Sequence, residues 1–171
     1  LLILSSLFFN NNLYAKEKFI GFIENLEGKI TKKAEDKIIQ LNIFDQILLN
    51  ENISISPGSS VTISFIDNSI LSLEDTSEFV VTKFENVKTE KIFELEILNG
   101  KFTFESGSIA KSRDDAMKIK LSDMEILLNG TLVTGENSND NKLIALVEDL
   151  SLIHIYEPTR LLSMYYSGIC M

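Results

Sequence analysis

The chain has 171 residues, of which 44% are hydrophobic and 24% are charged, and this composition predicts one compact domain with its own core. The formal net charge of −9 argues against nucleic acid or an anionic lipid surface as a partner, because both require a positive face. A local basic run at Lys29, Lys32, Lys33 and Lys37 is interpreted as a solvated strand edge or loop.

The first fifteen residues are expected to lie outside the fold. Residues 1–9 form an uncharged apolar run, and Ala15 is the small residue that precedes a cleavage site, so residues 1–15 resemble a truncated signal peptide without its basic start. The run is shorter than the roughly 20 apolar residues that cross a bilayer. These features predict an exported bacterial protein of the periplasm or cell surface, with no membrane span in the mature domain.

The last residues differ in composition from the rest of the chain. The only histidine, His154, and the only cysteine, Cys170, lie there together with three of the four tyrosines. Residues 151–160, SLIHIYEPTR, resemble a translated sequencing-library adapter, so residues 150–171 are interpreted as a non-native tail. The alternative is a genuine terminal strand at residues 152–156.

The domain is therefore expected at residues 16–149, which contain no histidine, cysteine or tryptophan. This segment lacks imidazole bases, thiolate nucleophiles, the usual zinc and iron ligands, and disulfides. We predict that the domain is not an enzyme and holds no cofactor.

The sequence of the domain predicts short strands separated by frequent turns, and it shows no long helical period. Strands are expected at residues 19–23, 29–31, 53–55, 79–84, 117–121, 125–128, 131–134 and 142–147. The pattern predicts an all-β fold in which antiparallel hairpins form a roll, a sandwich or a short β-solenoid. Residues 38–49 fit two short strands about Asp45 nearly as well as one amphipathic helix, and periodicity does not decide between them.

Residues 61–73 predict a first hairpin, because apolar residues alternate with polar ones on both sides of a polar break. The break consists of Asp67, Asn68 and Ser69, which are typical turn residues. A three-residue loop centred on Asn68 would pair Phe65 with Leu71 and keep the apolar side chains on one face.

Asn99 and Gly100 predict a second hairpin, because both central residues of a type I′ turn need positive φ. A two-residue loop at this dipeptide would pair Ile97 with Phe102, and the apolar residues of both strands would again share one face.

Several motifs follow one another in an order that resembles the FecR domain. They are Gly21, LEGKI at residues 26–30, ISFIDNSILSL at 63–73, LNGKFTFESG at 98–107 and NGT at 129–131. The resemblance covers most of residues 19–147. Asn68 stands where the family prefers glycine, and Phe44 stands where it often has glycine.

The resemblance implies a binding module. The best-known members of the family are periplasmic halves of transmembrane regulators that sense an outer-membrane iron–siderophore receptor. Here a signal sequence stands where such a regulator carries a cytoplasmic domain and a spanning helix, so the chain is more similar to exported FecR-domain proteins. We predict an exported sensor or interaction module whose partner is a protein or another cell-envelope component.

No catalytic, cofactor-binding or metal-binding residue is expected, and the residues singled out are structural turns: Asp67, Asn68, Ser69, Asn99, Gly100, Gly130 and Thr131. One alternative is a calcium-binding surface domain, since the loop at residues 135–141 is rich in oxygen ligands. A less favoured alternative is a carboxylate-based glycoside hydrolase that uses a pair from Asp67, Asp75, Asp114, Asp115 and Asp123.

Overall fold

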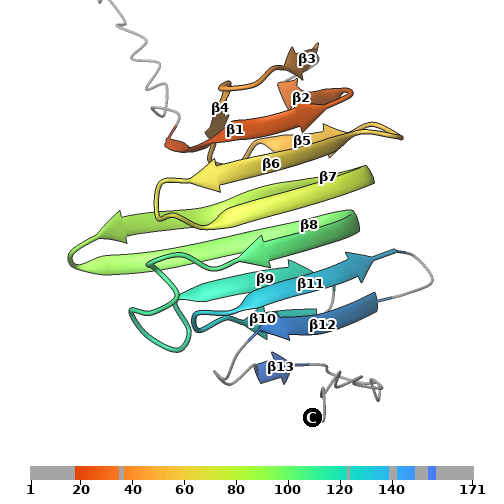
Figure 1. Cartoon of the computed structure of the whole chain (residues 1–171). Helices are drawn as coiled ribbons and strands as arrows, with labels where there is room; N and C mark the ends of the chain where they lie inside the picture. Colours follow the sequence, from red (N-terminus) through yellow and green to blue (C-terminus); the bar gives the residue numbers. More distant parts are fainter. Residues whose placement is uncertain (1–17, 35–36, 123, 139–141, 149–153, 157–171) are drawn as a thin grey trace, which may run out of the picture.

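The computed structural model describes residues 18–34, 37–122, 124–138, 142–148 and 154–156. In these ranges the chain forms thirteen strands of one sheet and no helix, which confirms the all-β prediction (Figure 1). Without a helix, the described ranges also offer none that could cross a membrane. The predicted signal peptide and most of the predicted tail lie outside the described residues.

The strands are β1 (Phe19–Glu27), β2 (Ile30–Ala34), β3 (Lys37–Leu41), β4 (Gln46–Leu48), β5 (Asn52–Ile55), β6 (Ser60–Phe65), β7 (Ile70–Val87), β8 (Glu90–Glu105), β9 (Met117–Leu121), β10 (Met124–Leu127), β11 (Leu132–Asn137), β12 (Lys142–Glu148) and β13 (His154–Tyr156). All pairings between them are antiparallel except that of β8 with β9. The short β13 pairs with β10.

Residues 38–49, for which the sequence did not decide between a helix and two strands, contain most of β3 and all of β4. Between them, Asp45 closes a tight turn: its carboxylate accepts a hydrogen bond from the Asn42 backbone N–H at 2.7 Å, and its own N–H donates to the Asn42 carbonyl at 3.1 Å. This local bonding forms a turn at the end of the first strand, and no helix forms across residues 38–49.

The two longest strands, β7 and β8, organise the sheet. The first part of β7 pairs with β6 and its later part with β5. The first part of β8 pairs with β9, whereas its last residues pair with β11. Each long strand therefore belongs to two halves of the sheet, and Figure 1 shows both strands folding back at the same end of the molecule.

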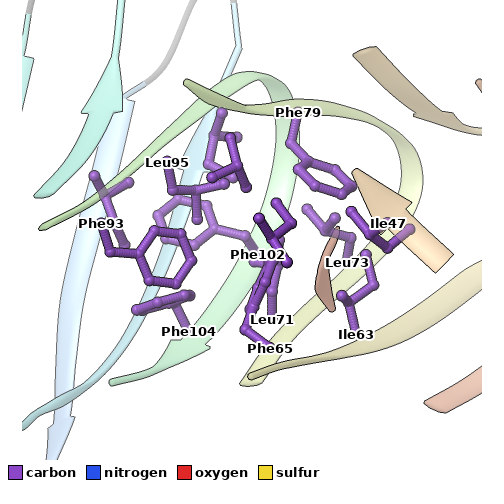
Figure 2. Close-up of a cluster of buried hydrophobic side chains, with 14 of the residues drawn as sticks. Ile47, Ile63, Phe65, Leu71, Leu73, Phe79, Phe93, Leu95, Phe102 and Phe104 are labelled. Atoms are coloured by element: carbon purple, nitrogen blue, oxygen red, sulfur yellow. The ribbon is translucent and has the colours of Figure 1, made fainter. Parts of the chain in front are cut away.

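Ring contacts show how strongly β8 bends. Phe93 and Phe104 lie eleven residues apart in this strand, which in straight β structure would separate them by roughly 36 Å. Their ring centroids are 5.6 Å apart. Phe93 also packs edge-on against Phe65 of β6, at 4.9 Å. The two halves of the curled sheet thus face each other across one aromatic and aliphatic core (Figure 2).

The first predicted hairpin is present between β6 and β7, but its predicted register is wrong. Leu71 pairs with Ile63 rather than with Phe65. Phe65 instead donates its N–H to the Ser69 carbonyl at 2.9 Å, so the loop is centred one residue earlier than Asn68. Asn68 takes the positive φ of 66° that closes this turn. A shift of two residues in pairing preserves the buried face, so the predicted core residues remain inside.

The second predicted hairpin is wrong, because β8 runs through Asn99 and Gly100 without reversing. The reversal lies at the other end of β8, where Val87 pairs with Glu90 around a two-residue loop. Gly100 does take a positive φ, of 100°, but it uses this freedom in the bend, where a Cβ atom would overlap Ser77 of β7. The predicted apolar face is buried nonetheless.

Candidate functional site

The bend of β7 and β8 gathers two of the predicted turn residues, Asn99 and Gly100. On β7, Asp75 and Thr76 have positive φ values of 36° and 54°. The Asn99 side-chain amide donates to the Thr76 carbonyl at 2.7 Å, and the buried Ser77 hydroxyl donates to a carbonyl of its own strand and to the Lys101 carbonyl of β8. The polar atoms of this region hold the bend together, so we assign it a structural role.

Asp67 and Ser69 form a second, closed polar group. Their exposed fractions are 1% and 0%, and the Ser69 hydroxyl donates to the Asp67 carboxylate at 2.8 Å. The Gly107 N–H donates to that same hydroxyl at 2.9 Å, and the Ser108 N–H donates to the Asp67 carbonyl at 2.8 Å. A Cβ atom on Gly107 would overlap the Asp67 backbone. These contacts lock two loops together and leave the Asp67 carboxylate facing protein groups.

Gly130 and Thr131 belong to a turn that joins the same loop region. The Thr131 N–H donates to the Ser106 hydroxyl at 2.7 Å, and the Ser106 N–H donates to the Thr131 carbonyl at 3.1 Å. Gly130 has a φ of 82°. Thr131 is 3% exposed, and its hydroxyl oxygen has no hydrogen-bond partner among the described residues.

The carboxylates considered for a glycoside hydrolase have separate local partners. Asp75 accepts from the Gly58 N–H at 2.7 Å, Asp114 from the Asn129 side-chain amide at 3.3 Å, and Asp115 pairs with Arg113 at 2.6 Å. Asp123 lies outside the described residues. The aspartates of this set that the structure describes are therefore each engaged with a different protein group.

The loop considered for calcium is described only in part, since residues 139–141 lie outside the described ranges. Within it, Asn137 is 2% exposed, and its amide donates to the carbonyls of Ile97 and Leu98 at 2.7 and 3.1 Å. This side chain is turned towards the bend of β8. No cluster of acidic residues suited to a metal ion is present in the part of the chain that the structure describes.

A charge cluster on the outer side of the sheet was not predicted. Glu94 of β8 is 7% exposed and pairs with Lys83 at 3.0 Å and Lys120 at 3.2 Å, and Lys120 also lies 3.6 Å from Glu125. Burial alone would raise the pKa of Glu94, but the hydrogen bonds from the two lysines outweigh it and lower the pKa. The hydrogen bond to Glu94 raises the pKa of Lys120. The sequence alone did not reveal this cluster, because the contact between Glu94 and Lys120 depends on the parallel register of β8 and β9.

The exposed apolar side chains are concentrated in one short segment. Nine large hydrophobic residues are exposed among those in residues 18–138 whose burial is described, and four of them lie within residues 38–44: Ile38, Ile39, Ile43 and Phe44. Ile38 and Phe44 are the most exposed, at 78% and 75%. We refer to residues 38–44 as the exposed apolar segment; it covers most of β3 and the turn into β4.

Phe44 is also held in an unusual backbone conformation. Its φ is 70°, in the left-handed region that favours glycine. The conformation is fixed by β1, because the Phe44 N–H donates to the Ile23 carbonyl at 2.8 Å and the Ile23 N–H donates to the Asp45 carbonyl at 3.1 Å. A strained residue that also exposes an aromatic ring is typical of a functional position. No feature of the sequence alone gave this conformation, although the resemblance placed a glycine at this point.

A family model described as FecR protein matches residues 51–152, which is more than half of the chain. The matched residues begin just before β5 and include both long strands and the bend. The exposed apolar segment precedes them. Searches of curated proteins and of solved structures found no match.

Proposed function

The chain belongs to the FecR family, and from this premise we propose that it is an exported, non-catalytic sensor or interaction module that binds a protein or cell-envelope component. The family assignment supports a sensor-type module. Export rests on the signal-like residues 1–15, and the absence of histidine and cysteine from residues 16–149 supports a role without catalysis.

The exposed apolar segment is the observation that carries the proposal. Folding buries thirty hydrophobic residues in one core, counted over the residues whose burial is described, yet it leaves Ile38 and Phe44 mostly exposed. Single exposed apolar residues are common on protein surfaces, whereas a run of them marks an interaction site. The strained Phe44 adds to this, because glycine would fit the same backbone with less strain.

A binding experiment on the full chain tests the proposal. The protein is immobilised and exposed to an extract of the source organism's cell envelope, and retained components are identified and then purified for a titration. We expect one component to bind saturably to the parent and to a Val87→Ser variant, and to bind more weakly to a variant that combines Ile38→Ser with Phe44→Ser. Val87 is a matched control because it is also an exposed apolar residue, at 52%, in the distant β7–β8 turn.

Two results would contradict the proposal. One is that no envelope component binds saturably. The other is that the protein turns over a substrate in a hydrolase panel, with activity lost on mutation of one of its aspartates. Fractionation of cells with an antibody to the domain tests export separately, since a protein that stays in the cytoplasm is not exported.

A further inference from the structure

We propose that Asn129 is a site of spontaneous modification, at which the backbone nitrogen of Gly130 converts the Asn129 side-chain amide to a carboxylate. The described residues contain two Asn-Gly pairs, Asn99 with Gly100 and Asn129 with Gly130. The structure holds the first pair inside strand β8 and leaves the second in a turn whose glycine is exposed. The inference goes beyond the proposed function and rests on how the fold separates two identical dipeptides.

The reaction uses only the chain and water. The Gly130 backbone nitrogen attacks Cγ of Asn129, so that a new N–Cγ bond forms and the bond from Cγ to Nδ2 breaks. The departing nitrogen leaves as ammonia and takes the proton of the Gly130 N–H. Water then opens the resulting five-membered succinimide at one of its two carbonyl carbons, which gives aspartate or isoaspartate at position 129. Glycine favours the attack because it has no Cβ atom to crowd the reacting nitrogen.

Gly130 has the room that the attack needs. It is exposed and lies between β10 and β11, outside the paired residues of both strands. Beyond its two chain neighbours, the described atoms nearest to a Cβ placed on Gly130 are carbons of the Lys111 side chain, at 3.5 and 3.8 Å. The Asn129 amide donates to the Asp114 carboxylate at 3.3 Å, which is a long hydrogen bond. The turn can therefore bring the Gly130 nitrogen to Cγ of Asn129 without breaking a strand pairing.

The other Asn-Gly pair is held in place by the sheet. Gly100 is paired with Asn137 of β11, and its backbone lies so close to Ser77 of β7 that a Cβ atom would overlap that residue. The Asn99 amide donates to the Thr76 carbonyl at 2.7 Å. Attack by the Gly100 nitrogen would require this part of the sheet to separate. Reaction at Asn99 must therefore wait for local opening.

Conversion at position 129 would alter the turn that contains it. A new carboxylate would place negative charge beside Asp114, so the attractive contact at 3.3 Å would become a repulsive one. Isoaspartate would also lengthen the backbone by one carbon atom. Two residues further on, the Thr131 N–H donates to the Ser106 hydroxyl at 2.7 Å, and the Ser106 N–H donates to the Thr131 carbonyl at 3.1 Å. We therefore expect conversion to loosen this link between the turn and the loop after β8.

Timed incubation of the full chain tests the proposal. The protein is kept folded at mildly alkaline pH, and peptide mass spectrometry measures the acid form at each asparagine, with electron-transfer fragmentation to separate aspartate from isoaspartate. We expect conversion at Asn129 to be at least about tenfold faster than at Asn99, because reaction at Asn99 requires local opening. In guanidinium chloride the two rates should agree within about twofold, since the unfolded chain no longer protects Asn99.

Variants separate the reaction from its consequence. Asn129→Gln keeps an amide but would have to form a larger ring, so conversion at position 129 should fall at least about tenfold while the rate at Asn99 stays unchanged. Asn129→Asp carries one of the two products from the start. In this variant the amides of Ser106 and Thr131 should exchange hydrogen at least about threefold faster than in the parent or in Asn129→Gln. Circular dichroism confirms that both variants are folded.

Several results would overturn the inference. Equal rates at Asn129 and Asn99 in the folded chain would show that the sheet gives no protection. A rate difference that persists unchanged in guanidinium chloride would assign it to the neighbouring sequence rather than to the fold. Conversion at Asn129 in the unfolded chain only would show that the turn protects this residue. Unchanged amide exchange at Ser106 and Thr131 in Asn129→Asp would contradict the expected loosening.

Discussion

The bend of β7 and β8 and the exposed apolar segment both contain residues with positive φ, but their surroundings are opposite. In the bend, Gly100 lies against the buried Ser77, and neighbouring polar atoms are hydrogen-bonded. In the segment, Phe44 takes the same kind of backbone conformation with its ring in water. Hydrogen bonds hold the backbone in both places, but Phe44 is 75% exposed, so its ring adds little packing to the fold. This difference separates residues that shape the sheet from residues available to a partner.

The largest loss in the free energy of unfolding is expected for a substitution in the core beside the bend. Phe93 contacts the rings of Phe65, Phe84 and Phe104, which belong to both halves of the sheet. Phe93→Ala should lower the free energy of unfolding by about 3–5 kcal/mol, because it leaves a cavity between them. Urea denaturation followed by circular dichroism measures this. Phe22→Ala is the matched control at a partly exposed ring, and an equal loss there would show that Phe93 has no special place in the core.

Gly100→Ala tests the bend itself. The added Cβ would overlap Ser77, and alanine disfavours the positive φ, so we expect a loss of about 3 kcal/mol in the free energy of unfolding. Gly58→Ala separates the two causes, since Gly58 has a φ of 67° but no atom within 4 Å of the place that a Cβ would take. Gly58→Ala should therefore lose about 1 kcal/mol. Equal losses at both positions would mean that the close approach of β7 and β8 contributes nothing.

A substitution in the charge cluster should have a smaller effect on the free energy of unfolding, and this effect should depend on pH. The pKa of Glu94 is lowered in the folded state, so its contribution to stability is present above the unfolded pKa of about 4.3 and is lost as the pH falls through the lower folded value. In Glu94→Gln this contribution is absent at every pH. The free energy of unfolding should then decline less between about pH 6 and about pH 3 than in the parent. A steeper decline in the variant than in the parent would contradict the prediction that the ionised Glu94 stabilises the fold.

The exposed apolar segment should show the smallest effect on stability, with the opposite sign. Phe44→Gly removes the strain of a positive φ and loses little packing, so we expect the free energy of unfolding to stay equal or to rise by about 1 kcal/mol. Denaturation by urea at neutral pH measures it. A loss of more than about 1 kcal/mol would show that the Phe44 ring supports the fold.

Sequence periodicity predicted most of the strands and the buried faces, because alternation depends only on local chemistry, but it did not decide the structure of residues 38–49. It could not give the register of the β6–β7 hairpin, where a shift of two residues buries the same side chains. Nor could it distinguish a hairpin from a bend at Gly100. Asn-Gly signals positive φ, and only the tertiary contact with Ser77 shows how that conformation is used.

The candidate site was less accessible to prediction than the fold. The basic run that includes Lys33 and Lys37 was interpreted as a strand edge or loop, and both lysines do lie beside the free edge of β3. The exposure of Ile38 and Phe44 was not predicted, because an apolar residue in a sequence is expected to be buried. Which apolar residues remain outside depends on the sheet order, since β2 is the only described strand that pairs with β3.

The most direct test of this account is the stability of one double variant, Ile38→Ser with Phe44→Gly. If the exposed apolar segment is a binding surface that the fold does not need, the free energy of unfolding should stay within about 1 kcal/mol of the parent value. A loss of more than about 2 kcal/mol would contradict it, because the segment would then be part of what stabilises the sheet.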